Sequence, residues 1–129
     1  MKPISIAVIV ATLAAACSGT EPSLESLTVV TDRTSYVVPA TVKVTLTNLS
    51  SQTVRTGACA SLERDQGDEW HPLPIAPCPA VLRELSSGRS ISVDINVPAG
   101  TPAGEYRAAM GVSASVVVPE IPSLPFGLQ

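Results

Sequence analysis

The sequence predicts an all-β sandwich, and three observations lead to this fold class. Apolar side chains recur with a period of two along most of the chain, which is the pattern of half-buried strands. Turn residues recur about every 8–12 positions, as in a sandwich of short strands. β-branched Val, Ile and Thr fill the alternating segments, and aromatic residues make up only 3% of the chain. Aliphatic side chains must therefore fill most of the core.

The first half of the predicted domain contains four extended segments. A strand is expected over residues 27–33, and Val42, Val44 and Leu46 then alternate with polar residues. Residues 48–52 read as a turn, followed by a strand at 53–57 that continues extended to residue 64. Residues 65–68 form a predicted hairpin turn, and residues 69–71 begin the returning strand.

The second half begins with a stretch that is rich in proline. Pro72, Pro74, Pro77 and Pro79 each lack an N–H, so this stretch is expected to be a loop or an edge segment. The clearest strand is residues 90–97, where Ile and Val alternate with Ser, Asp and Asn. The next strand places four residues on one face, namely Tyr106, Ala108, Met110 and Val112. Residues 116–118 and a stretch around Phe126 are expected to supply the last pairing.

The first 25 residues have a different composition. Lys2 precedes an apolar run at residues 4–16, which at 13 residues is too short to span a bilayer but fits a secretory leader. Ala14, Ala15 and Ala16 then precede Cys17, a pattern that resembles the lipobox of bacterial lipoproteins. The resemblance implies cleavage after residue 16, acylation of Cys17 and anchoring of the product on a membrane. Plain secretion with a free Cys17 is the alternative. Residues 17–25 read as an acylated cysteine and a flexible tether, and residues 26–129 as one domain.

Charge and cysteine content exclude several classes of function. Residues 1–16 contain one charge, Lys2, so the remaining 113 residues carry 7 basic and 11 acidic side chains, with no basic run. This argues against binding of nucleic acid. In an oxidising compartment Cys59 and Cys78 are expected to form a disulfide. A metal site with His71 is the alternative, but it offers two thiolates and one imidazole, and structural zinc sites use four ligands.

Residues 26–128 resemble the bacterial Ig-like domains found in many cell-envelope lipoproteins. The resemblance rests on an ordered set of short motifs, namely Asp32–Tyr36, Val42–Asn48, Leu62–Arg64 with Trp70, Leu85–Ser90, Ala103–Arg107 and Pro125–Phe126. It implies an immunoglobulin-like β-sandwich of seven to eight antiparallel strands and implies no activity. A similar fold occurs in a bacterial intracellular proteinase inhibitor.

Candidate sites in the domain are structural rather than catalytic. His71 stands in no recognisable nucleophile motif. Trp70 is expected to cover the core beside the disulfide, and Tyr106 is expected to form a tyrosine corner with the preceding loop. The acidic residues of 63–69 lack the spacing of a calcium loop. The sequence therefore predicts no enzyme, no cofactor and no metal.

The favoured hypothesis is a lipid-anchored module of the cell envelope that binds an unidentified protein partner or has a structural role. The location expected is the outer membrane or the periplasmic face in a cell with two membranes, and the cell surface otherwise. The alternative is a proteinase inhibitor that acts through the Pro72–Pro79 loop.

Overall fold

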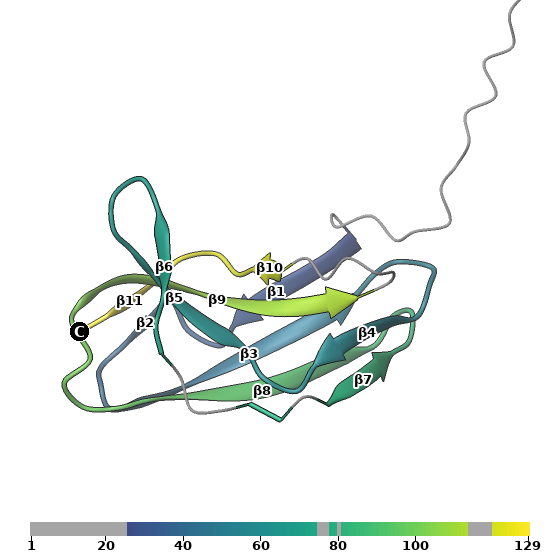
Figure 1. The fold of residues 1–129 in the computed structure, drawn as a ribbon, viewed down its shortest axis with the longest axis horizontal. Helices are drawn as coiled ribbons and strands as arrows, with labels where there is room; N and C mark the ends of the chain where they lie inside the picture. The colour runs from purple at the N-terminus through teal and green to yellow at the C-terminus, as the bar shows by residue number, and fades with distance from the viewer. Residues whose placement is uncertain (1–25, 75–77, 80, 114–119) are drawn as a thin grey trace, which may run out of the picture.

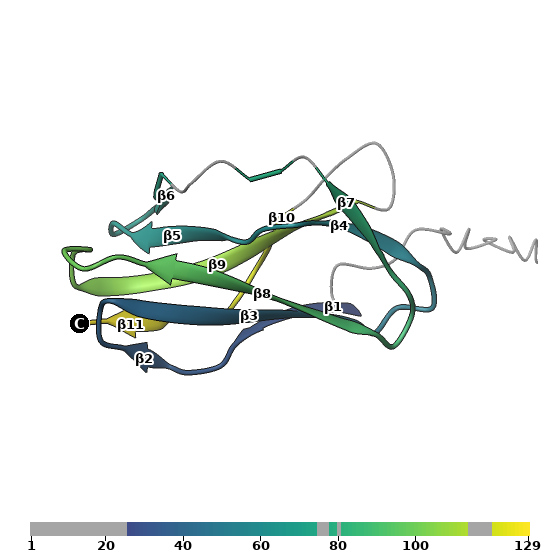
Figure 2. The ribbon, with the colours of Figure 1, turned by 90° about the horizontal axis from the view of Figure 1, so that it is seen from below.

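A computed structural model describes residues 26–74, 78–79, 81–113 and 120–129. The described residues form two β-sheets that pack face to face, with the core between them (Figures 1 and 2). The predicted all-β sandwich is confirmed. In this part of the chain no helix is long and apolar enough to cross a membrane.

The smaller sheet has three antiparallel strands in the order β1-β3-β8, namely β1 (Leu27–Thr31), β3 (Ala40–Asn48) and β8 (Ser90–Val97). Its inner face is built by the alternation seen in the sequence. Val42, Val44 and Leu46 have no exposed surface, and the polar residues between them point outward. Burial of such aliphatic side chains contributes about 1.5–3 kcal/mol each relative to exposure.

The larger sheet is organised around β9 (Gly104–Ser113). On one edge β9 pairs with β4 (Val54–Gly57) and β5 (Ser61–Asp65), and on the other with β10 (Glu120–Pro122) and β11 (Phe126–Leu128). The outer strands are β2 (Ser35–Tyr36), β6 (Trp70–Pro72) and β7 (Leu82–Leu85).

Eleven strand segments are present among the described residues, where seven to eight strands were expected. The difference arises because two long strands are interrupted and the first strand is divided between the sheets. β4 and β5 lie end to end along β9, as do β10 and β11, and β2 leaves the smaller sheet to pair in parallel with β11. Residues 116–118, expected to help form the last strand, lie outside the described residues.

Ser123 maintains the pairing of the C-terminal segment where prolines interrupt it. Pro122 and Pro125 flank Ser123 and Leu124 and cannot donate backbone hydrogen bonds. The Ser123 N–H donates to the Ala108 carbonyl at 2.7 Å, and its hydroxyl accepts from the Ala108 N–H at 3.0 Å. The hydroxyl therefore replaces a backbone acceptor in the pairing with β9, at the point between β10 and β11.

The two ends of the sandwich are formed by different turns and loops. β1 begins beside the turns at residues 48–50 and 86–89, since the Leu49 N–H donates to the Ser26 carbonyl and the Gly88 N–H to the Asn48 carbonyl. The opposite end holds the start of β3, the loop after β8 and the hairpin between β5 and β6, as Figure 1 shows. Ser26, the first described residue, therefore lies at the end that holds these turns.

Candidate binding cleft

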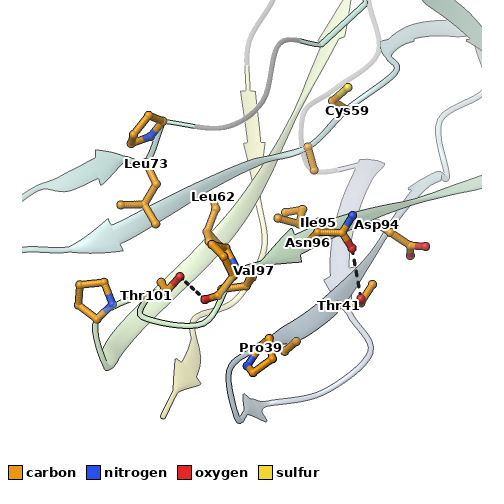
Figure 3. Close-up of a pocket in the computed structure, with 15 residues that line it drawn as sticks. Pro39, Thr41, Cys59, Leu62, Leu73, Asp94, Ile95, Asn96, Val97 and Thr101 are labelled. Atoms are coloured by element: carbon orange, nitrogen blue, oxygen red, sulfur yellow. Dashed lines mark hydrogen bonds between the residues drawn. The ribbon is translucent and has the colours of Figure 1, made fainter.

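A cleft of about 930 Å³ opens at the edge of the sandwich where β8 faces β5. Its walls come from the start of β3, the end of β8, the loop after β8, the segment before and within β5, and the segment after β6 (Figure 3). All of these except the region around Cys59 belong to the half of the sandwich remote from Ser26. Most of the cleft therefore lies between the sheets and away from Ser26, the first described residue.

The cleft is lined mainly by apolar side chains. Leu62, Ile95 and Val97 are buried in the core beneath it, and Leu73 packs against the same core. Among the lining residues Asp94 is the only one with a charged side chain. A mostly apolar lining with few polar groups is typical of clefts that bind ligands.

Cys59 and Cys78 form the expected disulfide. Their Cα atoms are 6.2 Å apart. Cys59 lines the cleft, and the bond ties the crossover between β6 and β7 to the start of β5. Residues 75–77 and 80 of the proline-rich stretch lie outside the described residues, so the proteinase-inhibitor hypothesis stays a prediction.

Trp70 has a different neighbour from the one expected. Its ring is half-buried and lies 4.6 Å from the Arg107 guanidinium carbon, which places it over a cation. The Arg107 Nε donates to Glu63 Oε2 at 2.7 Å, so the three side chains form a stack on the outer face of the larger sheet. Trp70 does not belong to the hydrophobic core that the described residues form.

Tyr106 is fully buried at the start of β9. Its hydroxyl donates to the Pro102 carbonyl at 2.7 Å, four residues earlier in the loop. This contact holds the loop that forms one wall of the cleft. Tyr106 therefore has a structural role, because it positions this loop.

His71 and the acidic residues lie at an exposed hairpin. The His71 Nε2 is 3.4 Å from Glu69 Oε2, and both side chains are largely exposed. Asp65 accepts from the Gly67 N–H at 3.0 Å, which closes the turn. In the described ranges no group of three or more His, Cys, Asp or Glu residues is placed to hold a metal ion.

Asp32 and Tyr36 form a polar corner where the chain leaves the smaller sheet for the larger. The Tyr36 hydroxyl donates to Asp32 Oδ1 at 2.6 Å, and the Lys43 N–H donates to the same oxygen at 3.1 Å. The hydrogen bond from Tyr36 is the main cause that holds the pKa of Asp32 below its usual value. Burial raises the pKa of Tyr36, and its bond to Asp32 raises it further.

The lowered pKa of Asp32 predicts a loss of stability in acid. A group with a folded-state pKa below its unfolded value of about 3.9 stabilises the fold above that pH, and the contribution disappears as the pH falls through the folded-state pKa. Asp32→Asn should therefore melt below wild type at pH 7, and the difference should shrink below about pH 4. Tyr36→Phe removes the hydrogen bond that is the main cause of the lowered pKa of Asp32. The difference between its melting temperature and that of wild type should likewise become smaller in acid. A gap that stays constant from pH 7 to pH 2 would contradict the assignment.

A family model for the bacterial Ig-like domain matches residues 23–118, most of the chain. The chain therefore belongs to the bacterial Ig-like domain family. No curated protein matches the sequence. Domains of this family are structural or binding modules, generally without enzymatic activity and commonly extracellular or surface-associated.

Proposed function

We propose that this chain is a non-enzymatic module of the cell envelope, anchored by lipid on Cys17, that binds a protein partner on the side away from the membrane. The observation that carries the proposal is the position of Cys17, directly after a 13-residue apolar run that ends in three alanines. The family assignment supports an extracellular binding or structural role. The disulfide supports an oxidising compartment.

The placement of the cleft supports binding over a purely structural role. If Cys17 is anchored, residues 17–25 reach at most about 30 Å from the membrane to Ser26. Ser26 contacts the turn at Leu49, at the end of the sandwich opposite the loop of residues 98–102. The cleft would then face outward, where a partner in the envelope can reach it.

The anchor is tested by Cys17→Ala, with Ser18→Ala as the matched control. We expect wild type and Ser18→Ala to incorporate a palmitate analogue and to sediment with membranes, whereas Cys17→Ala incorporates no label and leaves the membrane fraction. Mass spectrometry of the mature N-terminus identifies the modified residue. Wild-type protein that carries a free Cys17 thiol and no label would replace the anchor with plain secretion.

A further inference from the structure

β8 is the longest strand with an open edge in the described part of the chain. It has eight residues and pairs on one side with β3, and no described strand pairs with its other side. The terminal strands of the larger sheet are much shorter: β2 has two residues, β6 three and β7 four. An open edge presents unpaired N–H and C=O groups that can pair with another chain.

The phase of the hydrogen bonds shows which residues of β8 face this edge. The Lys43 carbonyl accepts from the Asp32 N–H at 3.1 Å, and the Lys43 N–H donates to Asp32 Oδ1, so the backbone groups of Lys43 point away from β8. Lys43 lies opposite Asp94 in the register. Pairs in an antiparallel ladder alternate between hydrogen-bonded and non-hydrogen-bonded. The Lys43–Asp94 pair is therefore non-hydrogen-bonded, and the N–H and C=O of Asp94 point out of the sheet.

The contacts of neighbouring pairs between β3 and β8 agree with this alternation. The Asn48 N–H donates to the Arg89 carbonyl at 2.9 Å, which places hydrogen-bonded pairs at the odd positions of β8. Side chains approach most closely in non-hydrogen-bonded pairs, and the hydroxyls of Thr45 and Ser92 are 2.8 Å apart. Ser92, Asp94 and Asn96 thus direct their backbone groups to the open edge.

The apolar cleft lies directly beside this edge. Asp94, Ile95, Asn96 and Val97 of β8 all line it (Figure 3). A strand added to β8 would place alternate side chains toward the larger sheet, because successive residues point to opposite faces. Those side chains would enter the cleft over Leu62 and Leu73, and the others would face solvent. The edge and the cleft together therefore match an extended segment with alternating apolar residues.

Charge distinguishes a partner segment from a second copy of this chain. Asp94 is exposed, and no ion pair involves it among the described residues. Antiparallel pairing of β8 with its own copy about the strand centre would bring the two Asp94 side chains opposite or diagonal to each other, which is unfavourable. A Lys or Arg at the position opposite Asp94 is favourable instead.

We propose that β8 binds an extended segment of a partner protein as an added antiparallel strand. Apolar residues of the segment enter the cleft, and a Lys or Arg lies opposite Asp94. The proposal deepens the binding role proposed above and does not depend on the lipid on Cys17, so the two can fail separately.

β3 shows what such a segment looks like. Residues 41–47 alternate Thr, Lys and Thr with Val and Leu, and they place Lys43 opposite Asp94 on the other edge of β8. A synthetic peptide with the sequence of residues 41–47 is therefore a suitable probe. The control peptide replaces its lysine with glutamate and keeps the alternation.

Binding to the mature, oxidised chain in detergent is measured by fluorescence anisotropy. We expect the lysine peptide to bind about fivefold more tightly than the glutamate peptide, and Asp94→Lys to reverse this order. Ser92→Pro should weaken binding of the lysine peptide by about tenfold, because it removes one outward N–H. It leaves the backbone hydrogen bonds to β3 intact and removes only the contact between the Ser92 and Thr45 hydroxyls. Equal affinities for both peptides, equal affinities of wild type and Ser92→Pro, or no binding at millimolar peptide would overturn the proposal.

Hydrogen exchange tests the edge without any variant. In the protein alone, the amides of Ser92, Asp94 and Asn96 should exchange rapidly, and those of Val93 and Ile95 slowly. The lysine peptide should slow the first group. Slow exchange of all five amides in the free protein would show a covered edge and overturn the proposal. Concentration-dependent dimers in sedimentation, abolished by Ser92→Pro, would overturn it in favour of a second copy.

Discussion

Asn48→Ala should lower the free energy of unfolding by about 3 kcal/mol, because it leaves several buried polar groups without partners. Asn48 has no exposed surface at the end of β3. Its Nδ2 donates to the Gln52 carbonyl at 2.7 Å and to the Leu85 carbonyl at 3.0 Å. Its Oδ1 accepts from the Ser50 N–H at 3.0 Å and from the Ser50 hydroxyl at 2.6 Å. The amide thus joins the ends of β3 and β7, which belong to different sheets.

Two further variants separate hydrogen bonding from volume in urea unfolding curves. Asn48→Asp keeps the volume, but it aims carboxylate oxygens at the two carbonyls, so we expect it to be at least as destabilising at pH 7. Asn96→Ala removes an exposed asparagine from β8 and should change the free energy of unfolding by less than about 0.5 kcal/mol. A loss below about 1 kcal/mol in Asn48→Ala would show that water satisfies the freed groups.

Removal of the disulfide should have an effect of similar size. The two cysteines are 19 residues apart, and closing a loop of that length contributes about 3 kcal/mol in the chain-entropy model. The double variant Cys59→Ser/Cys78→Ser should therefore unfold at markedly lower urea concentration. Its strands should be retained, because neither cysteine lies in one.

Reductant provides the control for this prediction. It should destabilise wild type to the level of the double variant and should leave the double variant unchanged. The lysine peptide should also bind the double variant more weakly, because Cys59 lines the cleft and Cys78 fixes the crossover beside it. Equal unfolding midpoints for oxidised wild type and the double variant would contradict a stabilising disulfide.

The strands that alternate most regularly were predictable from the sequence. β3 and β8 bury one face and expose the other, so a period of two is visible in both. The disulfide was also predictable, because two cysteines remained once Cys17 was assigned to lipid. Both inferences depend on local pattern or simple counting.

The strands missed by the sequence analysis lack such a pattern. β7 exposes three of its four residues, so its sequence shows no buried face. β2 has two residues and β10 has three, which is too short for periodicity to be visible. These segments are strands because β4, β11 and β9 provide their partners. Tertiary pairing of this kind cannot be read from one segment alone.

Contacts between segments that are distant in the sequence were harder to predict than the fold. The sequence placed Asn48 in a family motif and at the start of a turn, but nothing local shows that Leu85 lies beside it. Trp70 was expected over the core because large aromatic residues bury area efficiently. Its actual neighbour, Arg107, is held by Glu63, which lies 44 residues away in the sequence and meets Arg107 only in the folded sheet. The open edge of β8 likewise depends on the order of strands in space.

The parallel pairing of β2 with β11 has a consequence for how the protein is made. β11 lies between β2 and β9, so Ser35 and Tyr36 have no neighbouring strand until residues 126–128 have been synthesised. Contacts of such long sequence separation form late, because the intervening loop must first be closed. The larger sheet therefore cannot gain β2 until residues 126–128 have been synthesised, so this pairing completes the fold last.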